Sequence, residues 1–403
     1  MKTIAILGTF DTKGKEFAYL RDLIENQGLK TLCIHTGAFD PTFEPDITNG
    51  EVSEAVGVSI EEILAKKDRA FATDVMSRCA EKLVPRLYQE GRFDGIISIG
   101  GSGGTSMATP AMRTLPIGVP KVMVSTMASG NVSQYVGTSD IAMFPSVVDA
   151  EGLNAISMEI FSNAVNAIVG MVKNKKPIES SGKPLLAATM FGVTTPCIKK
   201  AEEYLQNAGF EVLVFHATGT GGKTMEALIR NGFIKGVLDI TTTEWCDELF
   251  GGVLNAGPNR LEAAGASGIP QVVSVGALDM VNFGPMNTVP NQYKKRNLYK
   301  HNPTVTLMRT TVEENRKLGE VIAEKLNKAK SPTVLMLPLN GVSAIDAEGQ
   351  PFYGPEEDAA LFETLRSNIG SNVELIEMHN NVNDEEFALA AAKRLVELIR
   401  ESE

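Results

Sequence analysis

The amino-acid sequence predicts an α/β protein made of two doubly wound, Rossmann-like domains whose sheets are mostly parallel. Apolar strands alternate with amphipathic helices along the chain, and strands this apolar are typical of parallel sheets that helices cover on both faces. The chain has 403 residues, whereas one hydrophobic core rarely grows beyond about 250–300 residues. An internal repeat divides the chain near its middle.

The repeat joins a segment that begins at Ile4 to one that begins at Leu185. Each runs through an apolar strand, a Gly/Thr turn, an amphipathic helix, an Asn-x-Gly stop and a second strand that ends in histidine. A match without a gap over about 30 residues favours duplication over the general likeness of two unrelated βα units. We therefore place an N-terminal domain at residues 1–178 and a C-terminal domain at 179–403, joined by the polar, proline-containing segment 173–184.

In the first half, apolar runs and helical periodicity define the elements in order. We expect strands near 3–7, 30–35, 94–99, 121–125 and 140–144, and helices near 13–27, 73–90, 104–114 and 151–172. Thr73 is a candidate N-cap for the second of these helices, and Gly91 is its stop signal.

The second half follows the same alternation. We expect strands near 185–190, 211–216, 236–240, 271–275, 304–308, 333–337 and 373–377, and helices near 196–208, 222–231, 244–250, 258–266, 311–329, 355–368 and 384–401. Thr195-Pro196 is a good helix start, because proline suits the first helical position.

Composition narrows the class of protein. The formal net charge of −11 argues against a nucleic-acid partner, which would require basic surface. No apolar stretch is expected to cross a bilayer and no signal peptide is visible, so we expect a cytoplasmic protein without a membrane partner. Its four scattered cysteines, Cys33, Cys79, Cys197 and Cys246, fit free thiols in a reducing compartment.

Three loops rich in glycine and hydroxyl residues follow strands of the first half: 8–16, 100–106 and 125–131. Backbone N–H groups, hydroxyls and one lysine at the carboxyl ends of strands suit phosphate oxygens. The candidate cofactor-binding residues are Gly8, Thr9, Asp11, Thr12, Lys13, Gly100, Gly101, Ser102, Gly103, Gly104, Thr105, Thr126, Met127, Ala128, Ser129 and Gly130.

In this hypothesis Lys13 meets a phosphate, and the amides of 101–105 surround the phosphates while 126–130 shape the pocket wall. Asp11 is a candidate ligand for Mg²⁺, through water, because carboxylates beside phosphates often hold this ion. The spacing after the first strand is not the G-x-G-x-x-G dinucleotide fingerprint. The alternative is that the three loops are tight turns that only allow helices to pack closely on the sheet.

A competing phosphate site lies in the second half. Residues 217–224, "ATGTGGKT", fit a relaxed P-loop, and Asp239 ends the next strand as a Walker-B carboxylate would. Ala217 stands where the first glycine of the motif belongs. We treat this loop as a minority hypothesis.

The second half also carries polar residues after several apolar strands, so they have the chance to meet at one edge of the sheet. The candidate catalytic residues are Glu244, Asp279, His301 and His379, and the candidate substrate-binding residues are Arg260, Arg309, Asn380 and Asn381. Histidine flanked by carboxylates suits acid–base catalysis or metal binding, and arginine suits an anionic metabolite. The alternatives are structural: a surface ion pair for Arg260 and a turn for Asn381.

Several long motifs, in order, resemble the Tm-1-like (UPF0261) family from residue 3 to about residue 400. They are "GTFDTKGKE", "SIGGSGGTSMAT", "STMASGNVSQYVGTSD", "GVLDITTTE", "HNPTVTLMRTT" and "HNNVND". The resemblance implies an ATP-binding protein with two Rossmann-like subdomains, often a homodimer. Our first hypothesis is therefore ATP bound with Mg²⁺ in the first half. The rivals are an enzyme that acts on a small phosphorylated or carboxylated metabolite between the domains, and an interaction module without catalysis.

Overall fold

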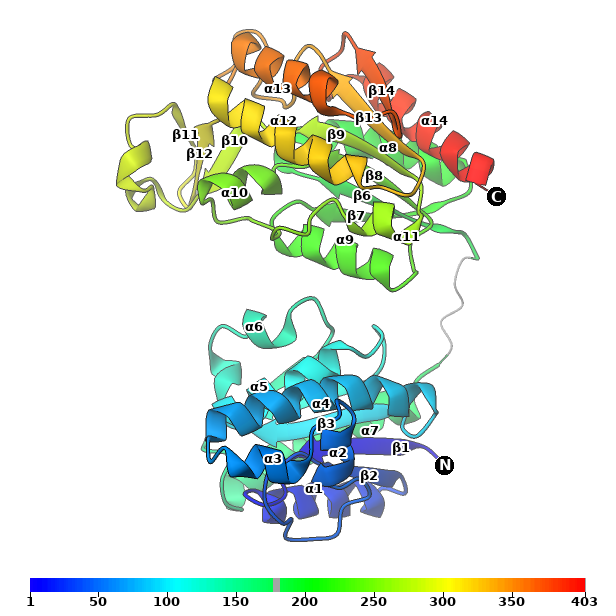
Figure 1. Ribbon diagram of the computed structural model, residues 1–403, viewed down its shortest axis with the longest axis vertical. Helices are drawn as coiled ribbons and strands as arrows, with labels where there is room; N and C mark the ends of the chain where they lie inside the picture. The colour runs from blue at the N-terminus through cyan, green and yellow to red at the C-terminus, as the bar shows by residue number, and fades with distance from the viewer. Residues whose placement is uncertain (177–181, 403) are drawn as a thin grey trace. The chain divides into compact units, whose positions relative to one another are not determined.

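A computed structural model describes residues 1–176 and 182–402. The chain divides into two compact units, Met1–Ile178 and Glu179–Glu403, each with its own sheets and core (Figure 1). Each unit is described by itself below. Part of the segment predicted as a linker, residues 177–181, lies outside the described residues.

The first unit is built on a five-stranded parallel sheet with the order β2-β1-β3-β4-β5, of which β1, β2 and β3 are labelled in Figure 1. Its strands are β1 (Thr3–Gly8), β2 (Lys30–His35), β3 (Gly95–Gly100), β4 (Lys121–Ser125) and β5 (Ala142–Pro145). Its helices are α1 (Gly14–Asn26), α2 (Asn49–Glu54), α3 (Ile60–Ala65), α4 (Arg69–Gln89), α5 (Ser102–Arg113), α6 (Ser133–Val136) and α7 (Ala155–Lys173), with the 3-10 turn η1 (Thr126–Ser129).

Strand alternation divides the core of this unit into two layers. Successive side chains of a strand point to opposite faces, so Ile4 and Ile6 pack with α1 and α7, whereas Ala5 and Leu7 pack with α4 and α5. Helices therefore cover both faces of the sheet and leave its carboxyl edge for loops.

The second unit contains a six-stranded parallel sheet with the order β14-β13-β9-β8-β6-β7. Its strands are β6 (Leu185–Met190), β7 (Glu211–His216), β8 (Gly236–Thr241), β9 (Gln271–Gly276), β13 (Thr333–Pro338) and β14 (Val373–Met378). Read from β7, the order of the first five strands is the same as in the first unit, 2-1-3-4-5, which is what duplication would produce.

Helices again cover both faces of this sheet. Buried residues of α8 and α14 form one core layer, and α9 to α13 contribute to the layers on the other face. The helices are α8 (Thr195–Asn207), α9 (Thr220–Arg230), α10 (Glu244–Phe250), α11 (Ala263–Ser267), α12 (Val312–Asn327), α13 (Pro355–Asn368) and α14 (Glu385–Ser402), with the 3-10 turns η2 (Gly192–Thr194), η3 (Met286–Thr288) and η4 (Asn291–Tyr293).

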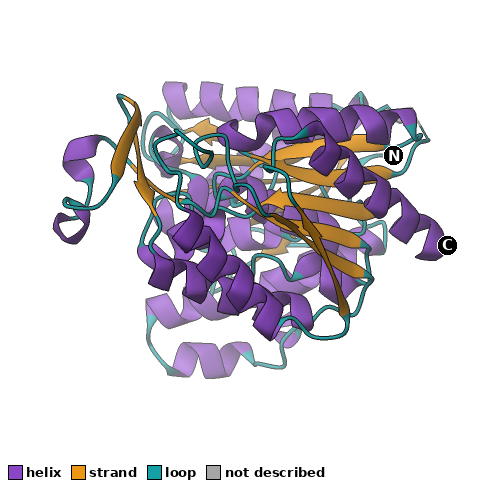
Figure 2. Cartoon of the chain, turned by 90° about the horizontal axis from the view of Figure 1, so that it is seen from above, coloured by secondary structure: helices purple, strands orange, loops and turns teal. Residues whose placement is uncertain are grey.

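A separate three-stranded antiparallel sheet, in the order β10-β12-β11, projects from the second unit (Figure 2). Its strands are β10 (Met280–Phe283), β11 (Leu298–Asn302) and β12 (Val305–Arg309). The sequence predicted only the last of them and placed it in the parallel series. β10 and β11 were missed because polar and charged residues such as Asn282 and Lys300 interrupt their apolar pattern.

The predicted fold class is confirmed: both main sheets are parallel, doubly wound and Rossmann-like. Two helix boundaries require correction. α4 begins at Arg69 rather than near Thr73, because the Asp68 side chain caps it by accepting the N–H groups of Ala70 and Phe71 at 2.8 and 3.1 Å. α11 begins at Ala263, so most of the helix expected over 258–266 is irregular.

α7 also differs from expectation. Among the described residues it is the one helix long and apolar enough to cross a membrane by length and composition, although no such stretch was expected. Phe161, Val165 and Ile168 on its buried face pack against the parallel sheet. This packing accounts for one face of α7, whereas Ile156, Met158 and Met171 leave apolar surface exposed on the same helix.

Candidate functional site

A cavity with a volume of about 880 Å³ lies in the first unit, at the loops that follow β1, β2 and β3. The order of the strands reverses between β1 and β3, and ligands of doubly wound sheets bind at such a point. The cavity is lined by Thr9, Asp11, Thr12, Lys13, Thr36, Gly37, Ala38, Phe39, Ile63, Leu64, Lys67, Asp68, Ala72, Thr73, Met76, Ile99, Gly101, Ser102, Gly103, Gly104 and Met107.

The loop after β1 turns tightly before α1. Gly8 is required there because a Cβ atom would overlap the ring of Phe17. The N–H groups of Thr12 and Lys13 both bond to the carbonyl oxygen of Thr9, at 3.3 and 3.0 Å. This turn places the Lys13 side chain at the cavity.

Asp11 connects the loops that follow β1 and β2. One carboxylate oxygen accepts the N–H of Thr12 at 2.8 Å, and the other accepts the N–H of Phe39 at 3.1 Å. A Cβ atom on Gly37 would overlap this carboxylate. Asp11 thus helps to fix the shape of the cavity.

α5 begins at the cavity without a side-chain cap. Its N-cap residue is Gly101, which has no side chain to bond to the first N–H groups of the helix. These N–H groups lack partners inside any helix, and together with the helix dipole they favour an anion. Ser102, Gly103 and Gly104, which carry them, line the cavity.

Thr105 is turned away from the cavity. Its hydroxyl lies 2.7 Å from the carbonyl oxygen of Gly101 and 2.6 Å from the hydroxyl of Ser125, and its side chain is buried. Gly100 is closely packed against the start of α5, because a Cβ atom there would lie 2.9 Å from the Cα of Gly104. These two predicted ligand residues, like Gly8 before them, support the loops and are not among the described residues that line the cavity.

The third predicted loop forms η1 beside the start of α5. Ser125 caps η1 by accepting the N–H of Met127 at 3.0 Å. Residues 126–130 are not among the described residues that line the cavity. The structure therefore brings two of the three predicted loops to one cavity.

Several lining residues were not predicted from the sequence. Gly37 and Phe39 follow β2, and the histidine and Thr-Gly turn shared by the two halves of the repeat gave a signal for this loop. Ile63, Leu64 and Lys67 belong to α3 and the junction after it. They lie in a stretch where the sequence predicted no element, although Ser59 followed by Glu62 is a capping pattern that could have indicated α3.

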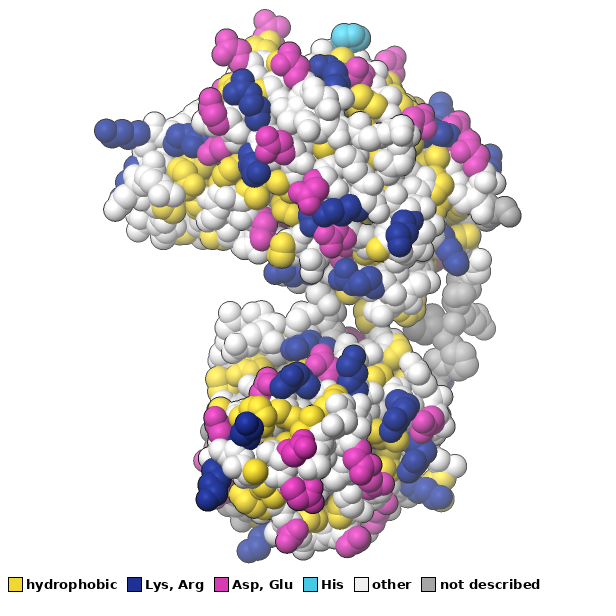
Figure 3. Space-filling view, viewed as in Figure 1, with side chains coloured by type: hydrophobic (Ala, Val, Ile, Leu, Met, Phe, Trp, Pro, Cys, Tyr) yellow, Lys and Arg dark blue, Asp and Glu magenta, His cyan; other side chains and the backbone are white. Residues whose placement is uncertain are grey.

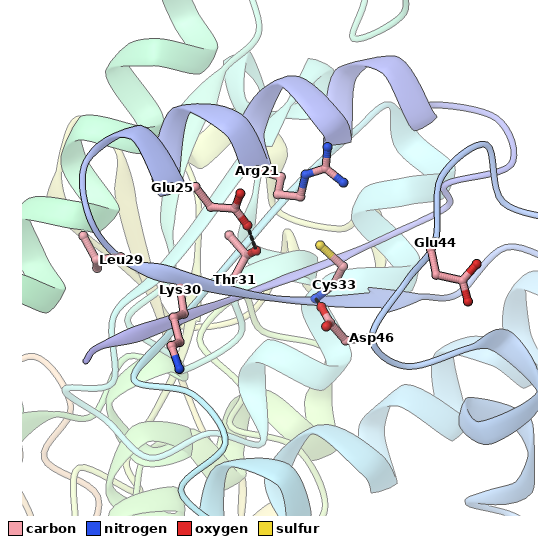
Figure 4. Close-up of a pocket in the computed structure, with 8 residues that line it drawn as sticks. All are labelled: Arg21, Glu25, Leu29, Lys30, Thr31, Cys33, Glu44 and Asp46. Atoms are coloured by element: carbon pink, nitrogen blue, oxygen red, sulfur yellow. Dashed lines mark hydrogen bonds between the residues drawn. The ribbon is translucent and has the colours of Figure 1, made fainter.

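A second hollow, of about 410 Å³, lies outside the edge strand β2 (Figure 4). Two of its acidic groups are engaged within the lining: Glu25 accepts the hydroxyl of Thr31 at 2.6 Å, and Asp46 accepts the N–H of Cys33 at 2.7 Å. Burial, followed by the charge of Asp46, raises the pKa of Cys33 to about 12, so this thiol is not a nucleophile at neutral pH. The hollow is a weaker candidate than the cavity at the carboxyl ends of the strands.

The relaxed P-loop of the second unit is filled by the chain itself. One carboxylate oxygen of Glu244 accepts the N–H groups of Gly219 and Gly222, at 2.7 and 3.1 Å. A Cβ atom on Gly222 would overlap this carboxylate. The loop thus binds an internal anion where a nucleotide phosphate was expected, and the P-loop hypothesis is wrong for this structure.

Arg260 lies at the centre of the same buried cluster. Its guanidinium bonds to Asp239 at 2.5 and 2.6 Å and to Glu244 at 2.7 Å, and Glu226 lies 3.6 Å away. Arg260 is 1% exposed. It is therefore neither a surface ion pair nor free to bind a substrate, and Asp239 is its partner instead of a Walker-B carboxylate.

Arg309 and Asp279 belong to a second buried cluster. Arg309 bonds to Asp346 at 3.3 Å and to Asp358 at 2.9 Å, and Asp279 accepts the hydroxyl of Ser343 at 2.8 Å. Burial, followed by the charge of Asp346, raises the pKa of Asp279 to about 7. The other carboxylate oxygen of Asp279 is buried without a hydrogen-bond partner.

The two candidate catalytic histidines of the second unit, His301 and His379, belong to neither buried cluster. His301 and His379 are exposed on β11 and after β14, and the described residues contain no group of three or more His, Cys, Asp or Glu side chains suited to a metal ion. Asn381 donates to the carbonyl oxygens of Ser343 and Asp346 at 3.1 and 3.3 Å, and Asn380 lies 3.4 Å from Asp384. Asn381 is a loop-fixing residue, as its structural alternative predicted.

Comparison with known proteins identifies relatives of the whole chain. Models of the uncharacterised protein family UPF0261 match twice, the N-terminal domain over residues 2–177 and the C-terminal domain over 183–399. A UPF0261 protein of Clostridium tetani (strain Massachusetts / E88) is 60% identical over 400 residues, which cover 99% of this chain and 99% of that protein.

Two further matches are more distant or partial. The ToMV resistance protein Tm-1(GCR237) of Solanum lycopersicum is 48% identical over 339 residues, which cover 82% of this chain and 45% of the tomato protein. The structure of UDP-N-acetylglucosamine 2-epimerase from Rickettsia bellii aligns over 100% of this chain and 96% of that chain at 10% identity, but a TM-score of 0.24 supports no inference. The two domain matches and the sequence relatives show that this chain belongs to the UPF0261 family.

Proposed function

We propose that the first unit binds ATP, with its phosphates in the cavity at the carboxyl ends of β1 and β3. The supporting observation is that two loops far apart in sequence, 9–13 and 101–104, line one cavity at the point where the strand order reverses. This is the position at which doubly wound sheets bind their ligands. The choice of ATP as the ligand comes from the family resemblance, which implies an ATP-binding protein.

The polar side of the cavity supplies donors for phosphate oxygens. The first turn of α5 has N–H groups without a side-chain cap. Lys13 lines the same cavity and forms no ion pair within residues 1–176 and 182–402. An uncompensated cation beside a helix N-terminus favours a bound anion.

The other side of the cavity is apolar and suits a nucleobase. Phe39 is 66% exposed, and Ile63, Leu64 and Met76 line the cavity with it. An exposed aromatic ring is a natural surface for stacking of a flat heterocycle. The volume of about 880 Å³ falls within the range of about 300–1,000 Å³ that is usual for small-molecule sites.

Asp11 fits an indirect role toward Mg²⁺. Each carboxylate oxygen already accepts one backbone N–H, and each retains a lone pair that a metal-bound water can use. We propose that phosphate oxygens and water supply most of the ligands of the ion, because Mg²⁺ commonly keeps several waters beside one or two carboxylates.

Isothermal titration of ATP and MgCl₂ into the full chain tests this function. We expect saturable binding, weakened roughly tenfold by Lys13→Ala, because hydrogen bonds to charged groups contribute about 1.5–3 kcal/mol. Lys15→Ala is the matched control, since Lys15 is exposed on the same helix and does not line the cavity. Absence of binding by the unmodified protein would refute the site, and equal binding by the Lys13 variant would remove Lys13 from it.

A further inference from the structure

Lys67 is a second lysine at the cavity, and no motif in the sequence indicated it. It lies between α3 and α4 and lines the same cavity as Lys13. Its side chain is exposed, and across the described residues it has neither an ion pair nor a side-chain hydrogen bond. The neighbouring Asp68 is engaged in capping α4.

The backbone of Lys67 is held in an unfavourable conformation. Its φ angle is +49°, in the left-handed region that is unfavourable for an L residue with a Cβ atom. Glycine or asparagine would adopt this conformation more easily. An exposed side chain gains nothing from packing there, and strain of this kind is concentrated at ligand sites.

An exposed lysine without an ion pair is common in this chain, since Lys15 and Lys66 also form none among the described residues. Over the visible face of each unit, Lys and Arg side chains alternate with Asp and Glu (Figure 3). At the cavity, Lys13 and Lys67 come from different segments and neither forms an ion pair among residues 1–176 and 182–402. The two carboxylates of the lining, Asp11 and Asp68, accept backbone N–H groups instead. Two lysines that reach one cavity from different segments suit a ligand with more than one negative charge.

We propose that Lys67 is a second phosphate-binding residue, which selects a nucleoside di- or triphosphate over a monophosphate. This inference rests on the proposed nucleotide function of the same cavity. Lys13 and the first turn of α5 hold one phosphate, and Lys67 contacts another phosphate of the chain. Charge-assisted contacts of this kind are about twice as strong as neutral hydrogen bonds.

The test is calorimetric titration of the full chain with AMP, ADP and ATP, each with MgCl₂. Lys67→Asn removes the charge but suits the left-handed backbone, and Lys67→Arg retains the charge. Lys66→Asn is the matched control, because Lys66 is the exposed neighbour that does not line the cavity. We expect Lys67→Asn to weaken ATP binding about tenfold and AMP binding less than about twofold, whereas Lys67→Arg and Lys66→Asn stay close to the unmodified protein.

The outcomes separate the two proposals. If the unmodified protein binds ATP but Lys67→Asn binds it equally well, or loses AMP and ATP to the same extent, the role of Lys67 is refuted and the nucleotide site stands. If the unmodified protein binds none of the three nucleotides, both proposals are refuted. Thermal unfolding of each variant accompanies the titrations, and Lys67→Asn is expected to be at least as stable as the unmodified protein because it relieves the backbone strain.

Discussion

A single side chain can determine whether the backbone N–H groups of a loop are free to bind a ligand. Glu244 lies where a phosphate would lie in the loop 217–222 and is neutralised by Arg260. Lys13, at the corresponding edge of the first unit, has no internal carboxylate partner among the described residues. The sequence identified all three side chains, but not which of them face one another, because this depends on contacts between distant loops.

Asp279 makes the stability of the second unit depend on pH. Its pKa is raised from 3.8 to about 7, first by burial and then by Asp346. The folded state therefore binds more protons than the unfolded state between about pH 4 and pH 7, so stability falls as pH rises through this window. Asp279→Asn, which stays uncharged, is expected to make the stability less dependent on pH, and Asp358, whose pKa burial also raises, accounts for part of the remaining dependence.

Trp245 is the single tryptophan of the chain and is buried in the second unit, so urea unfolding followed by its fluorescence at pH 5 and pH 8 measures this effect. Glu348→Gln, an exposed carboxylate in the loop after β13, is the control and should keep the pH dependence of the unmodified protein. An unchanged difference between the two pH values in Asp279→Asn would contradict the assignment.

At the scale of elements, the start of α5 shows how glycines with different surroundings have different roles. A Cβ atom on Gly100 would lie 2.9 Å from the backbone of Gly104, whereas a Cβ atom on Gly103 would meet nothing within 4 Å. We expect Gly100→Ala to lower the free energy of unfolding by about 1–3 kcal/mol through overpacking. Gly103→Ala should be neutral or stabilising by up to about 1 kcal/mol, because alanine is the better helix former.

Chemical denaturation followed by circular dichroism compares the two variants directly. Equal stability of the two would show that α5 can move away from β3. A fall for Gly103→Ala alone would contradict the open space beside this residue.

The sequence predicted best those elements whose hydrophobic pattern and end signals lie within their own residues. β1, β4 and α13 coincide with the predicted ranges to within a residue, because their apolar runs and capping residues are local. α2 and α3 are six-residue helices with few buried positions, and β10 and β11 are defined by antiparallel partners. The two helices begin at the local caps Thr48 and Ser59 but are too short for periodicity to reveal. The two strands depend on their tertiary partners. The part of the apolar cavity wall that α3 supplies was missed with this helix.

At the scale of the whole molecule, two separate cores predict two unfolding transitions, only one of which depends on ligand. ATP bound to the first unit should stabilise it by about 2.7 kcal/mol when free ATP is one hundred times its Kd. Thermal unfolding followed by far-ultraviolet circular dichroism should therefore contain a component that ATP shifts upward. The transition reported by Trp245 fluorescence should not move. A shift of the fluorescence transition alone would place the nucleotide in the second unit.

The identical order of the first five strands in the two sheets has an evolutionary consequence. If both halves descend from one ancestral βα module, its crevice has had two fates within a single polypeptide. In the second copy, the Glu244–Arg260 pair bonds to the backbone N–H groups of the loop, so the loop stabilises the fold and no longer binds a ligand. The other copy was free to specialise, so a search for activity in this family is better directed at the half in which a helix, α5, begins at a cavity without a side-chain cap.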